Sequence, residues 1–116
     1  MQIHEFIEDG LFSPTLVAGA LRTTKHEIAD TLGLGKDAFF RAARVRAPKT
    51  QTRLRQMLEI LRRVEEVTGS PLGAYAWFRS EPLPGFGGAT PDSLVRRGHG
   101  DWVHAYLDQV FAGGYA

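Results

Sequence analysis

The 116-residue sequence contains no cysteine and no long apolar run. The absence of cysteine excludes disulfides and thiolate metal sites, and it is compatible with a reducing compartment. No apolar segment approaches the roughly 20 residues that a membrane-spanning helix needs, and the first five residues are not a basic leader before an apolar stretch. We therefore expect a soluble protein of the cytoplasm without a membrane partner.

Segments that alternate apolar and polar residues, as half-buried strands do, are also missing. Several stretches instead carry apolar residues at helical spacing after a capping residue and a proline, as at Ser13-Pro14, Ser70-Pro71 and Thr90-Pro91. The sequence predicts an all-α protein, with helices over about residues 14–22, 24–32, 36–46, 50–68, 71–80, 90–97 and 101–112. Residues 3–12 are expected to form a frayed helix or an arm.

The two longest C-terminal patterns indicate which side chains are buried. In the helix 50–68, the apolar stripe consists of Leu54, Met57, Leu58, Leu61 and Val64. Its outer faces carry charges four residues apart, which we expect to pair as Arg55–Glu59, Glu59–Arg63 and Arg62–Glu66. In the last helix, one stripe is formed by Trp102, Val103, Tyr106, Leu107, Val110 and Phe111, opposite Asp101, His104 and Asp108. Trp77 and Trp102 are expected to lie in the core.

Charge is balanced overall but not along the chain, which carries a net charge of +1. Nine of the fourteen lysines and arginines lie between Lys36 and Arg63, where only Asp37 and Glu59 are acidic. This basic middle indicates contact with a polyanion or with an acidic protein surface. Solvated helix faces would produce the same pattern.

Residues 24–46 have the spacing of a helix-turn-helix, with a turn at Gly33 and a second helix suited to the major groove of DNA. In this interpretation Phe39, Ala42 and Ala43 face inward. The outward, candidate DNA-binding residues are Lys36, Phe40, Arg41 and Arg44. Asp37 would repel phosphates, and the alanines leave few groups able to read bases. An ordinary helical hairpin with a glycine turn is the alternative.

Residue patterns typical of enzymes are missing too. The four histidines include no pair four residues apart around a glutamate, as on a zinc-binding helix, and each serine is better explained as a helix cap, a helix end or a first-turn residue than as a nucleophile. The Gly87-Gly88 pair follows no strand and precedes no lysine, so it is not a phosphate-binding loop. We expect no catalytic activity, no cofactor and no metal.

The order of features from Pro71 onward is the most informative pattern in the sequence, and it resembles the toxin-binding domain of the Xre/ParS-type antitoxins. In that family an Xre-like helix-turn-helix precedes a small helical toxin-binding domain, so the resemblance divides this chain into residues 1–68 and residues 69–116. Two departures are a slightly longer loop and Gly35 in place of the serine that often opens the recognition helix. The matching features are Ala74/Ala76, Trp77-Phe78, Pro82-Leu83-Pro84, Gly87-Gly88, Thr90-Pro91, Leu94 and the turn Arg97-Gly98-His99-Gly100.

The resemblance implies a partner and a mode of action. Such antitoxins pair with a toxin of the RES-domain class, which destroys NAD, and their C-terminal segment blocks the toxin's substrate cleft. The resemblance also implies a homodimer that represses its own operon by binding operator DNA. The corresponding toxin-binding residues here are Phe111, Gly113, Gly114, Tyr115 and Ala116. Glycines allow a close approach to cleft walls, Tyr115 supplies a rigid contact, and a terminal carboxylate at Ala116 could imitate a substrate phosphate.

Three alternatives stay open. The last residues could be a frayed tail of small residues, as is common at chain ends. The whole protein could be a helix-turn-helix transcriptional regulator whose C-terminal half only dimerises. It could also be a structural adaptor for a different protein partner.

Overall fold

The structure is a computed structural model that describes residues 1–113. It confirms the all-α prediction: within these residues the only strands form one two-stranded hairpin near the N-terminus. The elements, in chain order, are the 3-10 helix η1 (Ile3–Phe6), β1 (Ile7–Glu8), β2 (Leu11–Phe12), α1 (Pro14–Ala20), α2 (Lys25–Thr31), α3 (Ala42–Val45), α4 (Pro48–Thr68), α5 (Pro71–Ser80), α6 (Pro91–Arg96) and α7 (Gly100–Gly113).

Most helices begin where the sequence predicts, because capping side chains are in place. Ser13, Thr24 and Ser70 each accept a hydrogen bond from a backbone N–H of the first turn, at 3.2, 3.1 and 2.9 Å. Thr90 occupies the N-cap position of α6 but does not cap it with its side chain, since its hydroxyl donates to the carboxylate of Asp92. The starts of α1, α2 and α5 are therefore encoded locally.

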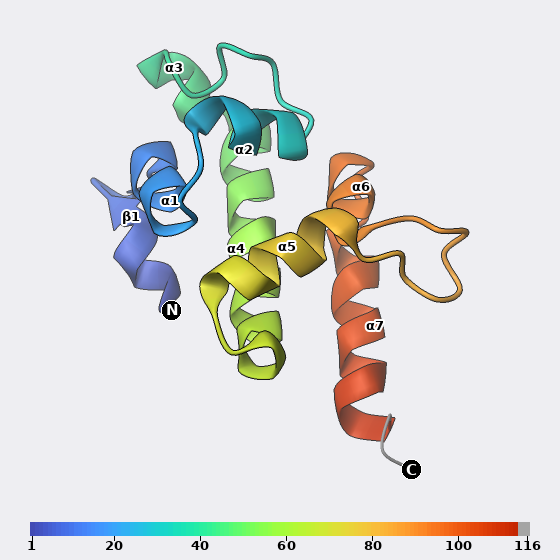
Figure 1. The fold of residues 1–116 in the computed structure, drawn as a ribbon. Coiled ribbons are helices and arrows are strands. Elements are labelled where there is room, and N and C mark those ends of the chain that lie inside the picture. The colour runs from blue at the N-terminus through green and yellow to red at the C-terminus, as the bar shows by residue number, and fades with distance from the viewer. Residues whose placement is uncertain (114–116) are drawn as a thin grey trace.

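Helix α4 stands at the centre of the molecule (Figure 1). The hairpin and α1 lie on one side of it, α6 and α7 lie on the other, and α5 crosses its face. All five residues of the predicted stripe are buried, and so are Ile60 and Thr50. The buried side chains form one cluster that extends from Phe6 to Leu107, so residues on both sides of position 68 contribute to it.

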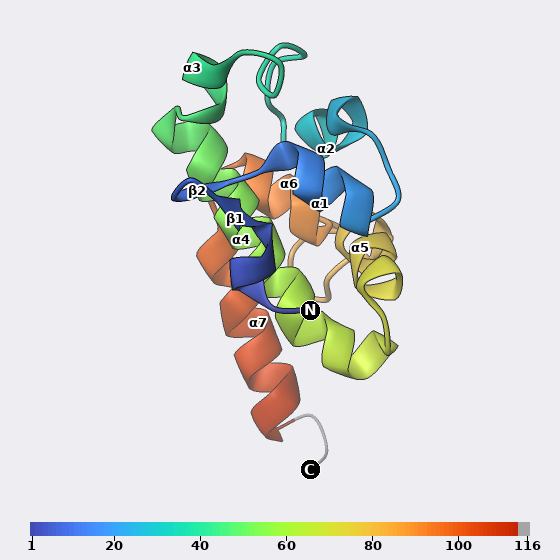
Figure 2. The same cartoon turned by 90° about the vertical axis from the view of Figure 1, so that its left-hand side faces the viewer.

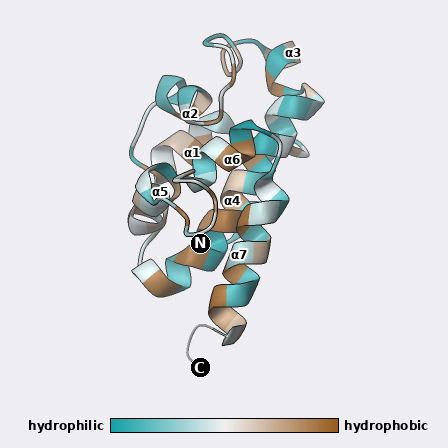
Figure 3. Cartoon of the chain, turned by 90° about the vertical axis from the view of Figure 1, so that its right-hand side faces the viewer, coloured by the Kyte–Doolittle hydropathy of each residue, from teal (hydrophilic) through white to brown (hydrophobic). Residues whose placement is uncertain are grey.

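The molecule is elongated, with extents of 47 × 26 × 21 Å. Helices α4 and α7 run in the same direction, and both views place α3 near one end of the molecule and the C-terminal end of α7 near the other (Figures 1 and 2). Hydrophobic residues continue along α7 to this end (Figure 3). No helix among residues 1–113 is long and apolar enough to cross a membrane.

The prediction of a continuous helix over residues 36–46 is wrong. Residues 36–41 form turns, with i→i+3 hydrogen bonds from Ala38 to Gly35 and from Phe40 to Asp37, and only Ala42–Val45 is helical. Ala38 and Phe39 are buried side by side, whereas Ala42 and Ala43, which were expected to face inward, are exposed. A longer helix here would need an apolar face packed on the protein, and Ala42–Val45 buries no residue, so the helix stays at a single turn.

Candidate functional site

The C-terminal half builds an unusual surface around α7. Helix α6 is followed by Arg97 and Gly98. The φ of Gly98 is 83°, in the left-handed region that favours glycine, and the next N–H, that of His99, donates to the carbonyl of Leu94 at 2.8 Å. This turn starts α7 directly afterwards. The His99 ring then stacks on Trp102, with ring centroids 3.7 Å apart and planes 11° apart.

Aromatic side chains continue along this face of α7. The loop 81–89 brings Phe86 to 6.2 Å from Trp102 and 6.4 Å from Tyr106, measured between ring centroids. The loop is held in place because Leu83 and Ala89 are buried and share a backbone hydrogen bond of 2.9 Å. The prediction that Trp102 is a core residue is wrong, since 43% of it is exposed, whereas Trp77 is partly buried against the core.

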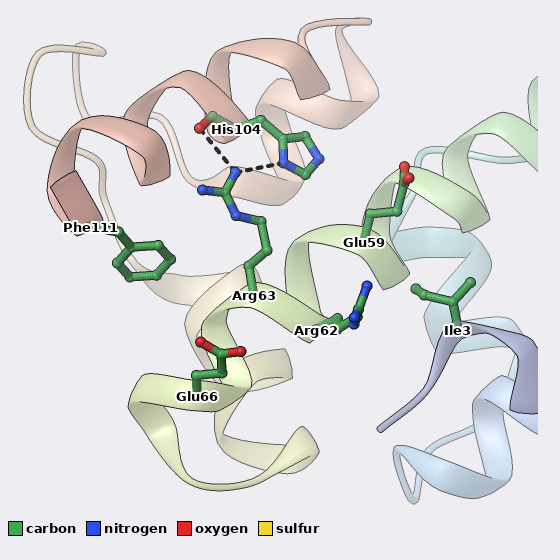
Figure 4. A pocket seen from close by; sticks show the side chains of 7 residues that line it. All are labelled: Ile3, Glu59, Arg62, Arg63, Glu66, His104 and Phe111. Atoms are coloured by element: carbon green, nitrogen blue, oxygen red, sulfur yellow. Dashed lines mark hydrogen bonds between the residues drawn. The ribbon is translucent and has the colours of Figure 1, made fainter.

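The opposite face of α7 packs on α4 through Arg63. Its guanidinium donates to the Nδ1 atom and the carbonyl oxygen of His104 at 3.0 and 3.2 Å, and to the Asp108 carboxylate at 2.7 Å. It also lies 5.5 Å from the centroid of the Phe111 ring. Figure 4 shows Arg63 projecting from α4 toward His104 and Phe111. Burial, and then the nearby Arg63 charge, lower the pKa of His104, so this histidine is neutral at pH 7.

These contacts line one side of an open groove of about 430 Å³ between α4, α7 and the N-terminal Ile3. Of the three predicted ion pairs on α4, only Arg55–Glu59 is present, with an N–O distance of 3.8 Å. The pair Glu59–Arg63 does not form, because Arg63 contacts Asp108 of α7. The prediction that Phe111 lies opposite His104 and Asp108 is wrong, because all three contact Arg63 from one face of α7. Their spacing of four and three residues is the sequence signal that could have revealed the contact.

The candidate toxin-binding residues follow at the end of α7. Phe111 is half-buried against Arg63, and Gly113 is the last residue of the helix and is exposed. The other three, Gly114, Tyr115 and Ala116, lie outside the described residues. The helix thus presents its C-terminal end away from the core (Figures 1 and 2).

The candidate DNA-binding residues lie at the other end of the molecule. Lys36, Phe40, Arg41 and Arg44 are all exposed, as expected. They do not share a helix, because only Arg44 belongs to α3 and Arg41 has an extended backbone. Phe40 folds back onto α2, where its ring lies 5.2 Å from that of His26 and 4.8 Å from the Lys25 ammonium. The exposed basic groups are accessible to a polyanion, but they do not lie on one recognition helix as in a helix-turn-helix.

Helix α2 is tied to the C-terminal half by two arginines that the sequence did not single out. Arg53 of α4 donates to the carbonyls of Leu32 and Gly33 at 2.9 and 3.1 Å and to that of Arg96 at 2.9 Å. Arg96 of α6 donates in turn to the Thr31 carbonyl at 2.9 Å. Together they satisfy the carbonyls at the C-terminal end of α2.

The side chains of α2 meet α5 and α6 as well. The Thr31 hydroxyl and the Tyr75 hydroxyl lie 3.2 Å apart, and Arg79 forms an ion pair with Glu27. Burial is the main reason why the pKa of Tyr75 is raised. Gly33 must be a glycine here, because its φ is 65° and an added Cβ would lie 2.8 Å from the Arg96 side chain. The turn that suggested DNA binding is therefore also a contact point with α6.

Within the part of the chain that the structure describes, no group of three or more histidine and carboxylate residues could hold a metal ion. Helix α7 carries an aromatic face around Trp102, an ion pair between Asp108 and Arg63 of α4, and an exposed C-terminal end at Gly113. These features are those of a small helical binding module. Residues 63–113 match a family model, the antitoxin Xre/MbcA/ParS C-terminal toxin-binding domain. The match confirms the resemblance seen in the sequence and supports an antitoxin role with a protein toxin as partner. Comparison with curated proteins and with solved structures found no match.

Proposed function

We propose that this chain is the antitoxin of a type II toxin–antitoxin pair and that it neutralises an NAD-degrading RES-domain toxin. In this proposal, the C-terminal segment from Phe111 to Ala116 enters the active-site cleft of the toxin and blocks it. The observation that carries the proposal is that the toxin-binding domain match ends at residue 113, so α7 leads directly into this segment.

The physical properties of α7 support the proposal. Its exposed end can reach into a concave site, while the aromatic face around Trp102 and Phe86 offers large apolar groups that can be desolvated on binding. Gly113 has no Cβ, and Gly114 follows it in the sequence, so the backbone can run close to cleft walls. The chain acts by binding and not by catalysis, and it works in the cytoplasm.

We further propose that residues 1–68 provide an operator-binding region and residues 69–116 the toxin-binding domain, and that the protein acts as a homodimer. The exposed basic side chains near α3 support the DNA contact, with Arg41 and Arg44 as its main cations. Phosphate contacts of this kind give binding that weakens steeply as salt rises.

A reciprocal pair of variants tests the proposal. Deleting residues 113–116 should abolish the rescue of cells that express the toxin encoded by the neighbouring reading frame, and cellular NAD should fall, while binding to the antitoxin's own promoter persists. The double substitution R41E/R44E should do the reverse. Rescue that survives the deletion would contradict the blocking mechanism, and a neighbouring protein that does not consume NAD would contradict the choice of toxin.

The alternative function is a transcriptional regulator whose C-terminal half only dimerises. It predicts tight, salt-sensitive promoter binding by the full-length chain and no complex with the neighbouring gene product. Co-purification of the two proteins, followed by an NAD-depletion assay, separates the two functions.

A further inference from the structure

The last part of α7 is held to the molecule differently from the first. The fully buried residues of this helix are Gly100, Val103 and Leu107, so the described residues that follow Leu107 contribute no fully buried side chain. Phe111 is partly buried against the core cluster, and the ion pair and the cation–π contact of this part of the helix are those of Arg63 with Asp108 and Phe111. These two contacts come from a single side chain of α4.

Arg63 is well placed for this task because its own helix is rigidly packed. Its neighbours Leu61 and Val64 are buried in the central cluster, so the Cα of Arg63 is fixed. From there the guanidinium reaches His104, Asp108 and Phe111, which are spaced four and three residues apart and therefore lie on one face of α7. The contacts extend over two turns of the helix, which fixes its direction as well as its distance from α4.

We propose that Arg63 is a positioning residue for toxin neutralisation. Its contacts with His104, Asp108 and Phe111, here called the Arg63 clasp, hold α7 against α4 and so set the direction in which the C-terminal segment is presented to the toxin. This inference rests on the proposed function. The cost of ordering a flexible segment on binding is reduced when the segment is held in its bound direction beforehand. Loosening the clasp should therefore weaken neutralisation while every residue of the segment stays in place.

The clasp also carries a proton-sensitive contact. The Nδ1 atom of His104 accepts from Arg63, which requires the neutral ring with its proton on Nε2. The charged groups that face this ring or line the groove beside it are Arg63, Arg62, Glu59 and Glu66 from α4 and Asp108 from α7. A protonated His104 would place a second cation against the guanidinium at 3.0 Å, so acidification should open the clasp.

The test compares Arg63→Met with Arg55→Met, an exposed arginine of the same helix whose one ion pair, with Glu59, is at 3.8 Å. In the free antitoxin, hydrogen exchange of the amides of residues 108–113 should become about tenfold faster in R63M, while the amides of α4 and α5 keep their protection. Neutralising the toxin from the neighbouring reading frame should also require about five- to tenfold more of the R63M protein than of the wild type. R55M should resemble the wild type in both measurements.

A pH series adds a measurement that a purely structural role would not change. After correction for intrinsic exchange rates, protection of residues 108–113 in the wild type should fall as the pH drops below about 6.5. The substitution His104→Gln, which cannot be protonated, should remove this step. If R63M matches R55M, or loses protection but neutralises normally, the positioning role is wrong. If the deletion of residues 113–116 neutralises normally, the proposed function fails, whatever R63M does to α7.

Discussion

Replacing Arg53 with methionine removes one of the links between the C-terminal end of α2 and the C-terminal half. The guanidinium of Arg53 donates three hydrogen bonds, to the carbonyls of Leu32, Gly33 and Arg96. Methionine retains much of the length and the apolar contact of the side chain, so the substitution removes the donors with little change in packing. Burial, and then the neighbouring Arg96 charge, lower the pKa of Arg53, as expected for a cation partly withdrawn from water.

The expected loss of stability follows from these contacts. A hydrogen bond that involves a charged group contributes about 1.5–3 kcal/mol. Three bonds from one guanidinium do not add, and water can reach the Gly33 carbonyl after the substitution. We therefore expect R53M to lower the free energy of unfolding by about 2–4 kcal/mol, and its Tm by about 8–16 °C at roughly 4 °C per kcal/mol for a chain of this length.

The measurement is urea unfolding followed by circular dichroism, with Arg55→Met as the matched control on the same helix. Arg55 makes one exposed ion pair, so its loss should change the free energy of unfolding by less than about 1 kcal/mol. The reasoning would be refuted if R53M and R55M unfolded at the same urea concentration with the same slope. Faster hydrogen exchange in α2 of R53M, at denaturant concentrations where α4 remains protected, would locate the loss at the intended contact.

Three further predictions concern stability and are checked by the same unfolding assay. Gly98→Ala should cost about 1–2 kcal/mol because φ is 83°, whereas Gly35→Ala, at a position without a positive φ or a close neighbour, should cost less than about 1 kcal/mol. The folded-state pKa of His104 is lowered, so its contribution to stability should be fully present above about pH 6.5 and be lost as the pH falls through the folded-state pKa. His104→Gln should remove this pH dependence of the free energy of unfolding. Phe78→Ala should cost about 3–5 kcal/mol, as for a fully buried ring, while Trp102→Ala, at 43% exposure, should cost less than about 1.5 kcal/mol.

The elements that the sequence predicts well are those whose signals are local. The starts of α5 and α6 follow from prolines at the first helical position, glycines with positive φ come after α4 and α6, and the buried stripe of α4 follows from its spacing. Helix α4 begins at Pro48, two residues before its predicted start. The prediction of a helix around residues 36–41 was wrong because the alanines of this region favour a helix locally, while the fold buries Ala38 and Phe39 together through tight turns. Which conformation forms depends on the packing of Ala38 and Phe39 in the buried cluster, which is a property of the whole fold.

The candidate site shows the same division. The family resemblance predicts Phe111 and Gly113 as toxin-binding residues, which stays a prediction. The contacts of Arg63 were predicted wrongly, because Glu59 four residues away is a partner at the expected spacing. The actual partners are 41 and 45 residues further along the chain. Trp102 was misassigned for a related reason, since an apolar stripe on a helix does not reveal how much of that stripe the neighbouring elements cover.

The arrangement of the two candidate surfaces bears on how an antitoxin of this shape could also act on its operator. The exposed basic residues near α3 and the end of α7 lie at opposite ends of a molecule 47 Å long (Figure 1). In the proposed function, the two partners would therefore contact this chain at separate surfaces. The two ends are nevertheless joined by a short path of packed helices, because α4 carries Arg53 at the α2 contact and Arg63 at the α7 contact. A toxin that shifted α7 against α4 would therefore act on the same rigid helix that holds α2 in place. In the proposed function, an influence of toxin on DNA binding that passes through α4 would change when Arg53 or Arg63 is substituted.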